Sequence, residues 1–191
     1  MRTSFYICLF LVFAISCKKE QDSARKAAPP DQTEINNLKL NQIQILGSHN
    51  SYHKRMDGRL FSAISNISFL LPAEYQPEEL DYFHEPLNDQ LNTYGMRGFE
   101  IDIYNDPNGG LFFNRAANSL ARMTVASNIP ELKQPGLKVL HIPDVDYETY
   151  YYTFKSMLSA LKTWSDAHPN HLPVFLHIET KETAVTDVVA F

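Results

Sequence analysis

The sequence predicts an α/β protein in which parallel strands alternate with helices. Four short apolar runs recur along the chain, and stretches long enough for a crossover helix lie between them. Such runs are typical of buried parallel strands, because parallel neighbours need long crossover connections. We therefore expect strands at 42–49, 97–104, 137–142 and 172–179.

The N-terminus, which precedes this repeat, has the pattern of a secretory signal peptide. Arg2 is followed by an apolar stretch that is too short to cross a bilayer as a helix. Residues 14–17, Ala-Ile-Ser-Cys, resemble a bacterial lipobox, in which the signal is removed before a cysteine that is then acylated. We expect a signal peptide at 1–16 and a lipidated Cys17. The alternative is an ordinary signal peptide that happens to contain this cysteine.

The cysteine count and the next segment agree with this interpretation. The chain has two cysteines, and Cys8 lies within the expected signal, so no disulfide framework is expected. Residues 17–40 are charged, contain proline and lack periodicity, which predicts a flexible tether. We expect a secreted lipoprotein of the bacterial cell envelope, held at the membrane surface through Cys17, with one folded domain at 41–191.

Two passages between the expected strands have helical patterns. Residues 86–91 lead into a helix that we expect to end at Gly95. The passage 147–168 is amphipathic, with apolar residues spaced by three and four, so one face is expected to pack on the sheet. These apolar residues are Phe154, Met157, Leu158, Leu161 and Trp164.

Four successive βα units predict the first half of a TIM-like (β/α)8 barrel. A closed barrel usually needs about 250 residues. The sequence ends at 188–191 in an apolar run without a cap or charge, after a short expected helix at 184–191, which favours a truncated chain. A small open sheet that is complete as it stands is the alternative. It would leave the strand at 172–179 as an uncovered edge, which is an aggregation liability.

Polar side chains occur at the end of every expected strand. Because the carboxyl ends of parallel strands share one face, a single active site there accounts for all of them together. The residues are His49, Asn50, Glu100, Asp102, His141 and Glu179.

The types of these residues indicate a metal site with histidines beside it. Glu100 and Asp102 are two apart on one strand, so their side chains leave the same face and repel each other unless a cation lies between them. With Asn50 and Glu179 they form an oxygen-only set, which suits calcium or magnesium rather than zinc. His49 and His141 are then available for proton transfer.

Four segments together resemble the bacterial calcium-dependent phosphoinositide phospholipase C family, from about residue 42 to the end. The resemblance implies a TIM-like barrel, Ca2+, and cleavage of the phosphodiester between inositol and diacylglycerol in a phosphoinositide-like phospholipid. By this resemblance His49 and His141 are the catalytic histidines, and Asn50, Glu100, Asp102 and Glu179 are the calcium ligands. The segments are GSHNSYH at 47–53, YFHEPLNDQLNTYGMRGFEIDIY at 82–104, LKVLHIPDVDY at 137–147 and TWSDAHPNHLPVFLHIETKE at 163–182.

The implied chemistry needs no protein nucleophile. The inositol 2-hydroxyl would attack phosphorus while calcium lowers the pKa of that hydroxyl and offsets phosphoryl charge. The resemblance and the residues leave the separate roles of His49 and His141 open. His141 would protonate the leaving oxygen or support the phosphoryl charge, and His49 would support the same charge.

Two other functions remain as alternatives. A glycerophosphodiester phosphodiesterase also uses a barrel, paired histidines and an E-x-D metal site, but it normally begins with an HRG-like motif where this chain has Gly-Ser-His-Asn at 47–50. The second alternative is a non-catalytic surface lipoprotein that binds lipid or glycan head groups. The net charge of −5 is mild, and no basic stretch alternates with aromatic residues, so nothing indicates a nucleic-acid partner, and no protein partner is evident.

Overall fold

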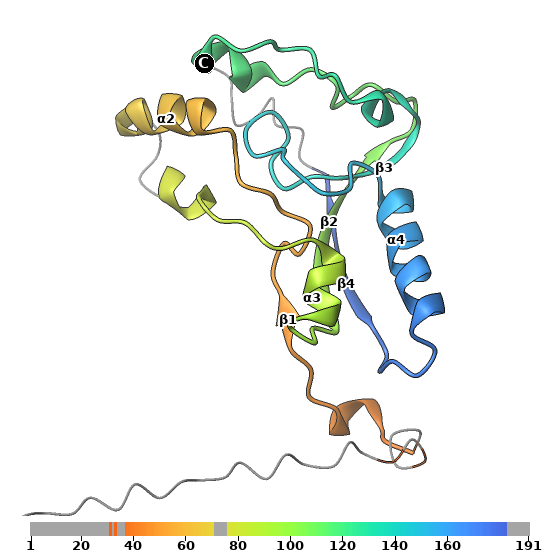
Figure 1. Ribbon diagram of the computed structural model, residues 1–191. Coiled ribbons are helices and arrows are strands. Elements are labelled where there is room, and N and C mark those ends of the chain that lie inside the picture. Colours follow the sequence, from red (N-terminus) through yellow and green to blue (C-terminus); the bar gives the residue numbers. More distant parts are fainter. Residues whose placement is uncertain (1–30, 32, 34–36, 71–75, 183–191) are drawn as a thin grey trace, which may run out of the picture. The chain divides into compact units, whose positions relative to one another are not determined.

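The computed structural model describes residues 31, 33, 37–70 and 76–182 (Figure 1). The chain divides into two units, Met1–Ile43 and Gln44–Phe191. In the first, a short 3-10 helix, η1, spans Leu40–Gln42. The expected signal peptide, Cys17, most of the tether and the expected helix at 184–191 lie outside the described residues. The second unit contains the sheet and its helices.

The second unit is organised around one long central strand, β2, at Gly98–Asp106. β4 (Phe175–Lys181) runs parallel to β2 and pairs with it from Gly98 to Tyr104. β1 (Gly47–Ser48) is also parallel and pairs with the start of β2. β3 (Gly136–Val139) is antiparallel and pairs with the last four residues of β2, from Ile103 to Asp106.

β1 and β3 occupy the same edge of β2. β4 fills the other edge along 98–104, so only one edge is left for both short strands. Ser48, the last residue of β1, pairs with Phe99, and Val139, the last residue of β3, pairs with Ile103. Because one strand is parallel and the other antiparallel, their carboxyl ends point toward each other. Between them, residues 100–102 of β2 lack a strand partner on this edge.

The expectation of four parallel βα units is therefore wrong for β3. Residues 107–135 form no crossover helix but two 3-10 helices, η4 (Ala116–Ala121) and η5 (Pro130–Lys133). The Gly110 N–H donates to the Leu132 carbonyl at 2.9 Å, so the chain returns to the end of β2 from which it left. In the part of the chain that the structure describes, the sheet is mixed and does not close into a barrel, and the expected first half of a TIM-like barrel is not found.

The helices follow the expected positions more closely. α3 spans Leu87–Asn92 and is followed by Gly95 at a φ of 65°, so the glycine lies just beyond the helix, as expected. α4 spans Phe154–Ala167, with the Thr153 hydroxyl capping it by accepting from the Ser156 N–H. It begins later than expected because 148–150 pair with 52–54 as extended chain. The other helical segments are α2 (Gly58–Asn66), η2 (Ser68–Leu70) and η3 (Pro77–Leu80).

The two faces of β2 have different environments. Phe99, Ile101 and Ile103 are buried in one apolar cluster with residues of α3 and α4, including Met157 and Trp164. The intervening residues Glu100, Asp102 and Tyr104 point to the opposite face, because side chains alternate along a strand. Burying each large apolar side chain stabilises the fold by about 1.5–3 kcal/mol. The helix-covered face thus anchors β2 and leaves its polar face available for a site.

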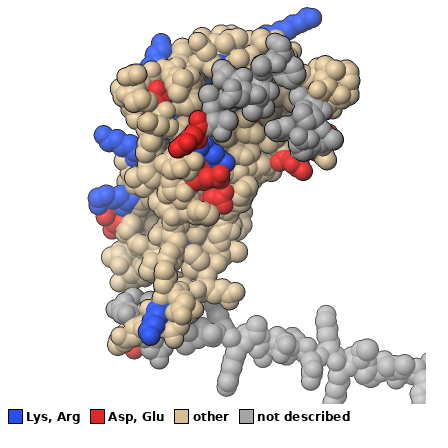
Figure 2. All heavy atoms as spheres, turned by 180° about the vertical axis from the view of Figure 1, so that it is seen from behind, with Lys and Arg blue, Asp and Glu red and all other residues tan. Residues whose placement is uncertain are grey.

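The surface of the molecule carries few charges on one side. Figure 2 shows that uncharged side chains cover most of this face, with acidic side chains gathered around basic ones near its middle. None of the helices within the described residues has the length and apolar character needed to cross a membrane.

Substitutions at two adjacent glycines can test the turn that makes β3 antiparallel. Gly109 has a φ of +76°, and a Cβ there would clash with the Lys133 carbonyl oxygen, whereas Gly110 has a φ of +89° and open space around it. We predict that Gly110→Ala lowers the free energy of unfolding by about 1–2 kcal/mol through backbone strain alone. Gly109→Ala adds a steric clash of about 1–3 kcal/mol. Urea denaturation measures both, and equal losses would contradict the close approach.

Candidate functional site

The site lies where the ends of β1 and β3 face each other across residues 100–102. The turn after β1 is attached to β2 by two hydrogen bonds, from the Ser51 N–H to the Glu100 carbonyl and from the Glu100 N–H to the Ser51 hydroxyl, both 3.0 Å. Asn50 has a φ of 48°, and the His53 N–H donates to its carbonyl at 2.9 Å. This tight turn, residues 50–53, therefore lies beside the polar face of β2.

Gln90 of α3 also binds this turn through side-chain hydrogen bonds. Its side chain is buried, its Nε2 donates to the Ser51 and Glu85 carbonyls at 2.7 and 2.6 Å, and its Oε1 accepts from the Ser48 hydroxyl at 2.7 Å. Sequence analysis did not assign Gln90, because two of its three partners, Ser48 and Ser51, lie about forty residues away. A buried amide with all these bonds satisfied fixes the turn relative to α3.

Three carboxylates form the first part of the site, which we call the acidic trio: Glu100, Asp102 and Glu179. One carboxylate oxygen of each lies within 4.8 Å of the others. Asp102 pairs with Glu179 in the register of β2 and β4, and Glu100 precedes Asp102 by two residues on the same face. Asp102 is buried, Glu100 is half-buried and Glu179 is exposed. The trio predicted from the sequence is thus brought together.

Lys181 of β4 offsets part of the charge of the acidic trio. Its Nζ lies 2.6 Å from Glu179 Oε1 and 3.5 Å from Asp102 Oδ2. The hydrogen bond from Lys181 lowers the pKa of Glu179. The pKa of Asp102 is nevertheless raised, chiefly by burial and further by Glu179, against the opposing effect of Lys181. The trio retains unbalanced negative charge, which favours a bound cation.

Asn50 and His49 lie at the margin of the trio. Asn50 is buried, and its amide bonds to the Tyr82 hydroxyl at 2.9 Å and accepts from the Tyr52 hydroxyl at 3.3 Å. Burial and then the charge of Asp102 raise the pKa of Tyr52, so this hydroxyl links Asn50 to the trio. His49 is 73 % exposed, with its Nε2 3.3 Å from Glu100 Oε1.

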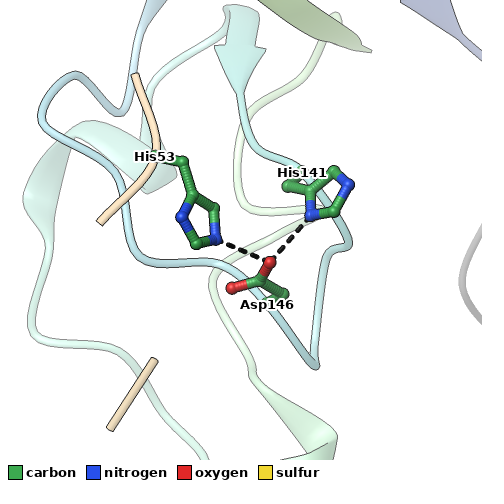
Figure 3. Close-up of side chains that lie close together, drawn as sticks. All are labelled: His53, His141 and Asp146. Atoms are coloured by element: carbon green, nitrogen blue, oxygen red, sulfur yellow. Dashed lines mark hydrogen bonds and ion pairs between the residues drawn. The ribbon is translucent and has the colours of Figure 1, made fainter. Parts of the chain in front are cut away.

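His141 belongs to a second group, which we call the histidine–aspartate cluster: His53, His141 and Asp146 (Figure 3). Asp146 Oδ2 lies 2.7 Å from both His53 Nε2 and His141 Nδ1. The side chains of His53 and Asp146 are fully buried, and that of His141 is 19 % exposed. Burial opposes ionisation of Asp146, but the two histidine hydrogen bonds outweigh it and its pKa is lowered.

A short turn brings Asp146 under His141. The Ile142 N–H donates to the Asp146 carbonyl at 3.0 Å, and the Asp146 N–H donates to the Ile142 carbonyl at 2.8 Å. Asp144, at a φ of 70°, lies at the tip of this turn, and its carboxylate accepts from the Ala116 N–H. The spacing of His141 and Asp146 in HIPDVD was a local signal for this contact. The contribution of His53, 93 residues from Asp146, had no local signal.

A comparison with known families bears on the chain as a whole. A family model described as phosphoinositide phospholipase C, Ca2+-dependent, matches residues 38–190. The chain belongs to this family. No curated protein and no solved structure matches the chain. The resemblance inferred from the sequence is confirmed at the level of the family, and the match includes the acidic trio, Asn50, both predicted histidines and the histidine–aspartate cluster.

Two aspartates of this phospholipase C family member are expected to affect stability in opposite directions. The folded pKa of Asp102 is raised, so its stabilising contribution exists below the ordinary value of 3.8 and is lost as pH rises through the folded pKa. We predict that Asp102→Asn raises the free energy of unfolding at pH 7 in chelator. The folded pKa of Asp146 is lowered, so its contribution is present above 3.8 and is lost as pH falls through the folded pKa. Asp146→Asn should cost about 1.5–3 kcal/mol at pH 7, the usual contribution of a hydrogen bond to a charged group.

Urea denaturation at pH 7 and at pH 3 measures both effects. The Asp146→Asn deficit should shrink at pH 3, because the contribution of the lowered pKa begins to be lost once pH falls below 3.8. Asp166→Asn is the control, because Asp166 and its partner Lys162 are exposed and such pairs contribute less than about 1 kcal/mol. A lower free energy of unfolding for Asp102→Asn at pH 7 would show that charge repulsion within the acidic trio does not destabilise the fold.

Proposed function

We propose that the protein is a phosphoric diester hydrolase that cleaves phosphatidylinositol-type phospholipids with the aid of Ca2+. The observation that carries the proposal is the convergence of Glu100, Asp102 and Glu179, from two parallel strands, on one face beside His49. The family is named for calcium dependence and for phosphoinositide substrates, which agrees with this arrangement.

The acidic trio fits a calcium ion in its donor chemistry and in its hydrogen bonding. All donors are oxygens, as calcium prefers. Among the described residues, Asp102 Oδ1 is buried and has no hydrogen-bond partner. We infer that Glu100, Asp102 and Glu179 would hold the ion, with Asn50 as a further oxygen ligand, and that Lys181 would give up its contacts with them. Bound there, calcium would offset phosphoryl charge and make the inositol 2-hydroxyl more acidic.

In this proposal the two histidines contact the phosphodiester of the substrate. The inositol 2-hydroxyl lies next to the phosphate within the substrate, so its attack produces a cyclic phosphate without a covalent enzyme intermediate. His49, exposed beside Glu100, would contact the phosphoryl oxygens. His141, held by Asp146, would face the same phosphate. Preorganised donors of this kind lower the barrier because they are aimed at charge that develops in the transition state.

We predict that the full-length protein releases inositol 1,2-cyclic phosphate from phosphatidylinositol only when Ca2+ is present. His49→Ala and His141→Ala should each lower turnover about a hundredfold or more. Phosphorus NMR of the products measures the reaction. Release of glycerol phosphate instead would assign the protein to the glycerophosphodiester phosphodiesterases, and calcium binding without turnover would indicate a non-catalytic lipoprotein.

The ligand set is tested separately from turnover. Glu179→Gln should weaken Ca2+ binding in calorimetric titration at least tenfold, because it removes one charged ligand. Glu182→Gln is the matched control, since Glu182 is exposed at the end of the same strand region. Equal Ca2+ affinity in both variants, or full activity in excess chelator, would remove the metal site from the proposal.

We also propose that the protein is anchored at the cell envelope through Cys17, after removal of residues 1–16. Cys17→Ser should therefore prevent acylation and move the protein from the detergent phase to the aqueous phase in a phase-partition experiment. Hydrolysis of phosphatidylinositol in detergent micelles should stay unchanged, since the tether separates Cys17 from the sheet in sequence. An unchanged partition would show that Cys17 is not the anchor.

A further inference from the structure

The carboxylate of Asp146 depends on two histidines for its charge. It is fully buried, and its ion-pair partners among the described residues are His53 and His141, both on Oδ2. A buried carboxylate without donors is costly, so it tends to bind a proton instead. Burial pushes the pKa of Asp146 up, yet the two hydrogen bonds bring it below its ordinary value. The ionised form therefore requires an N–H from each histidine.

This requirement fixes the tautomer of both rings. His53 must carry a proton on Nε2 and His141 must carry one on Nδ1, because these atoms lie 2.7 Å from the shared oxygen. A neutral imidazole has only one N–H, so Nε2 of His141 is an unprotonated acceptor until the ring becomes positive. Figure 3 shows that this second nitrogen of His141 points away from Asp146.

The next proton taken up by the cluster has two possible positions, and their surroundings differ. Among the described residues, Nδ1 of His53 is buried and has no hydrogen-bond partner, and the ring is stacked on Tyr82 at a centroid distance of 4.1 Å. A proton there would create a buried N–H without an acceptor, which costs about 1–3 kcal/mol. The ring of His141 is 19 % exposed, so a proton on its Nε2 can reach water or a substrate.

His53 is also held too firmly to move toward a substrate. Its N–H donates to the Asn50 carbonyl at 2.9 Å, and its own carbonyl accepts from the His84 N–H at 3.1 Å. It forms a bridge with Thr149 as well. His53 can therefore act on a reaction only through Asp146 and His141.

The side chains around His141 are acidic or neutral. Asp102 of β2 is near enough to interact with a charge on His141. Tyr104 donates its hydroxyl to the His141 carbonyl at 3.0 Å. Tyr82, stacked on His53, stays neutral because burial raises its pKa to about 12. No lysine or arginine of the described residues forms an ion pair with Asp146, whose partners are His53 and His141.

We propose that Asp146 and His53 are positioning residues that direct the exchangeable proton of this cluster to Nε2 of His141, which donates it to the leaving oxygen of the phosphodiester. This role rests on the proposed function. The oxygen of the inositol 2-hydroxyl forms a bond to phosphorus and gives its proton to a carboxylate of the acidic trio. The bond from phosphorus to the diacylglycerol oxygen breaks with its electron pair, and that oxygen takes the proton from His141.

The dependence on the leaving group distinguishes this role from a structural one. Diacylglycerol leaves as an alkoxide and needs a proton, whereas a 4-nitrophenyl ester of inositol phosphate leaves as a stable phenolate and does not. In the full-length protein with Ca2+, Asp146→Asn should lower kcat on phosphatidylinositol about a hundredfold. It should lower kcat on the aryl ester less than tenfold, with KM changed little for either substrate. Equal losses on both substrates would reduce Asp146 to a structural residue.

Two matched variants complete the activity test. Asp144→Asn removes a carboxylate from the tip of the same turn and keeps a residue that tolerates its φ of 70°, so both substrates should be hydrolysed at nearly wild-type rates. His53→Gln retains an N–H donor for Asp146 and should keep most activity, whereas His53→Leu should show the same leaving-group dependence as Asp146→Asn. If Asp146→Asn does not fold, the His53 pair still decides the outcome, and equal behaviour of its two members would overturn the proposal.

Nitrogen-15 NMR of labelled histidine gives a result that does not depend on turnover. Neutral His141 should be protonated at Nδ1 and not at Nε2, and neutral His53 should be protonated at Nε2 and not at Nδ1. In Asp146→Asn, the Nε2–H form of His141 should gain population. A wild-type His141 protonated at Nε2 when neutral, or coordination of one equivalent of Zn2+ by the two histidines, would overturn the proposal. The expected tautomers in a protein that fails to cleave phosphatidylinositol would reject the proposed function and leave the proton arrangement intact.

Discussion

The opposed approach of β1 and β3 along one edge of β2 is the constraint on which the rest of the structure depends. Because β4 occupies the other edge from Gly98 to Tyr104, the two short strands share what remains, and their carboxyl ends stop on either side of residues 100–102. The segments that follow β1 and β3 must therefore both leave the sheet at this point. Backbone groups of β2 that would have paired with a strand pair with the turn at Ser51 instead. Polar side chains of both departing segments therefore gather at the middle of a sheet edge and not only at its end.

The histidine–aspartate cluster and the acidic trio differ in how their buried carboxylates are stabilised. Asp146 is fully buried, and both histidines donate to it, so its charge is stabilised within the fold. Asp102 is equally buried, and Oδ1 of each aspartate lacks a hydrogen-bond partner among the described residues. Lys181, which pairs with both Asp102 and Glu179, supplies only part of the charge that would balance the acidic trio, and unbalanced carboxylates held close together favour a cation. The first arrangement suits a rigid support, and the second suits a group that binds a cation.

The sequence allowed the acidic trio to be predicted, because its geometry is local to two strands. Glu100 and Asp102 share a face by the period of two, and Glu179 ends an apolar run that has the pattern of another parallel strand. The direction of β3 could not be predicted in this way. The run Leu137–Leu140 has the composition of a strand, but its orientation is set by contacts of Gly109 and Gly110 with residues 132–134, which no periodicity reveals. His141 nevertheless arrives near the predicted place, since an antiparallel β3 ends opposite the middle of β2 rather than at its far end.

The turn at 50–53 connects the two groups mechanically. It carries Asn50, the proposed metal ligand, and His53, the donor to Asp146, and a hydrogen bond from the His53 N–H to the Asn50 carbonyl joins them. Tyr82 touches both, because its hydroxyl bonds to the Asn50 amide and its ring stacks on His53. A displacement of Asn50 toward a cation therefore acts on the ring that supports Asp146, and through it on His141. Since an error of about 1 Å in such a site can cost on the order of a hundredfold in rate, one rigid turn that sets both positions would keep the proposed metal ion and the proposed proton donor correctly placed on the same phosphate.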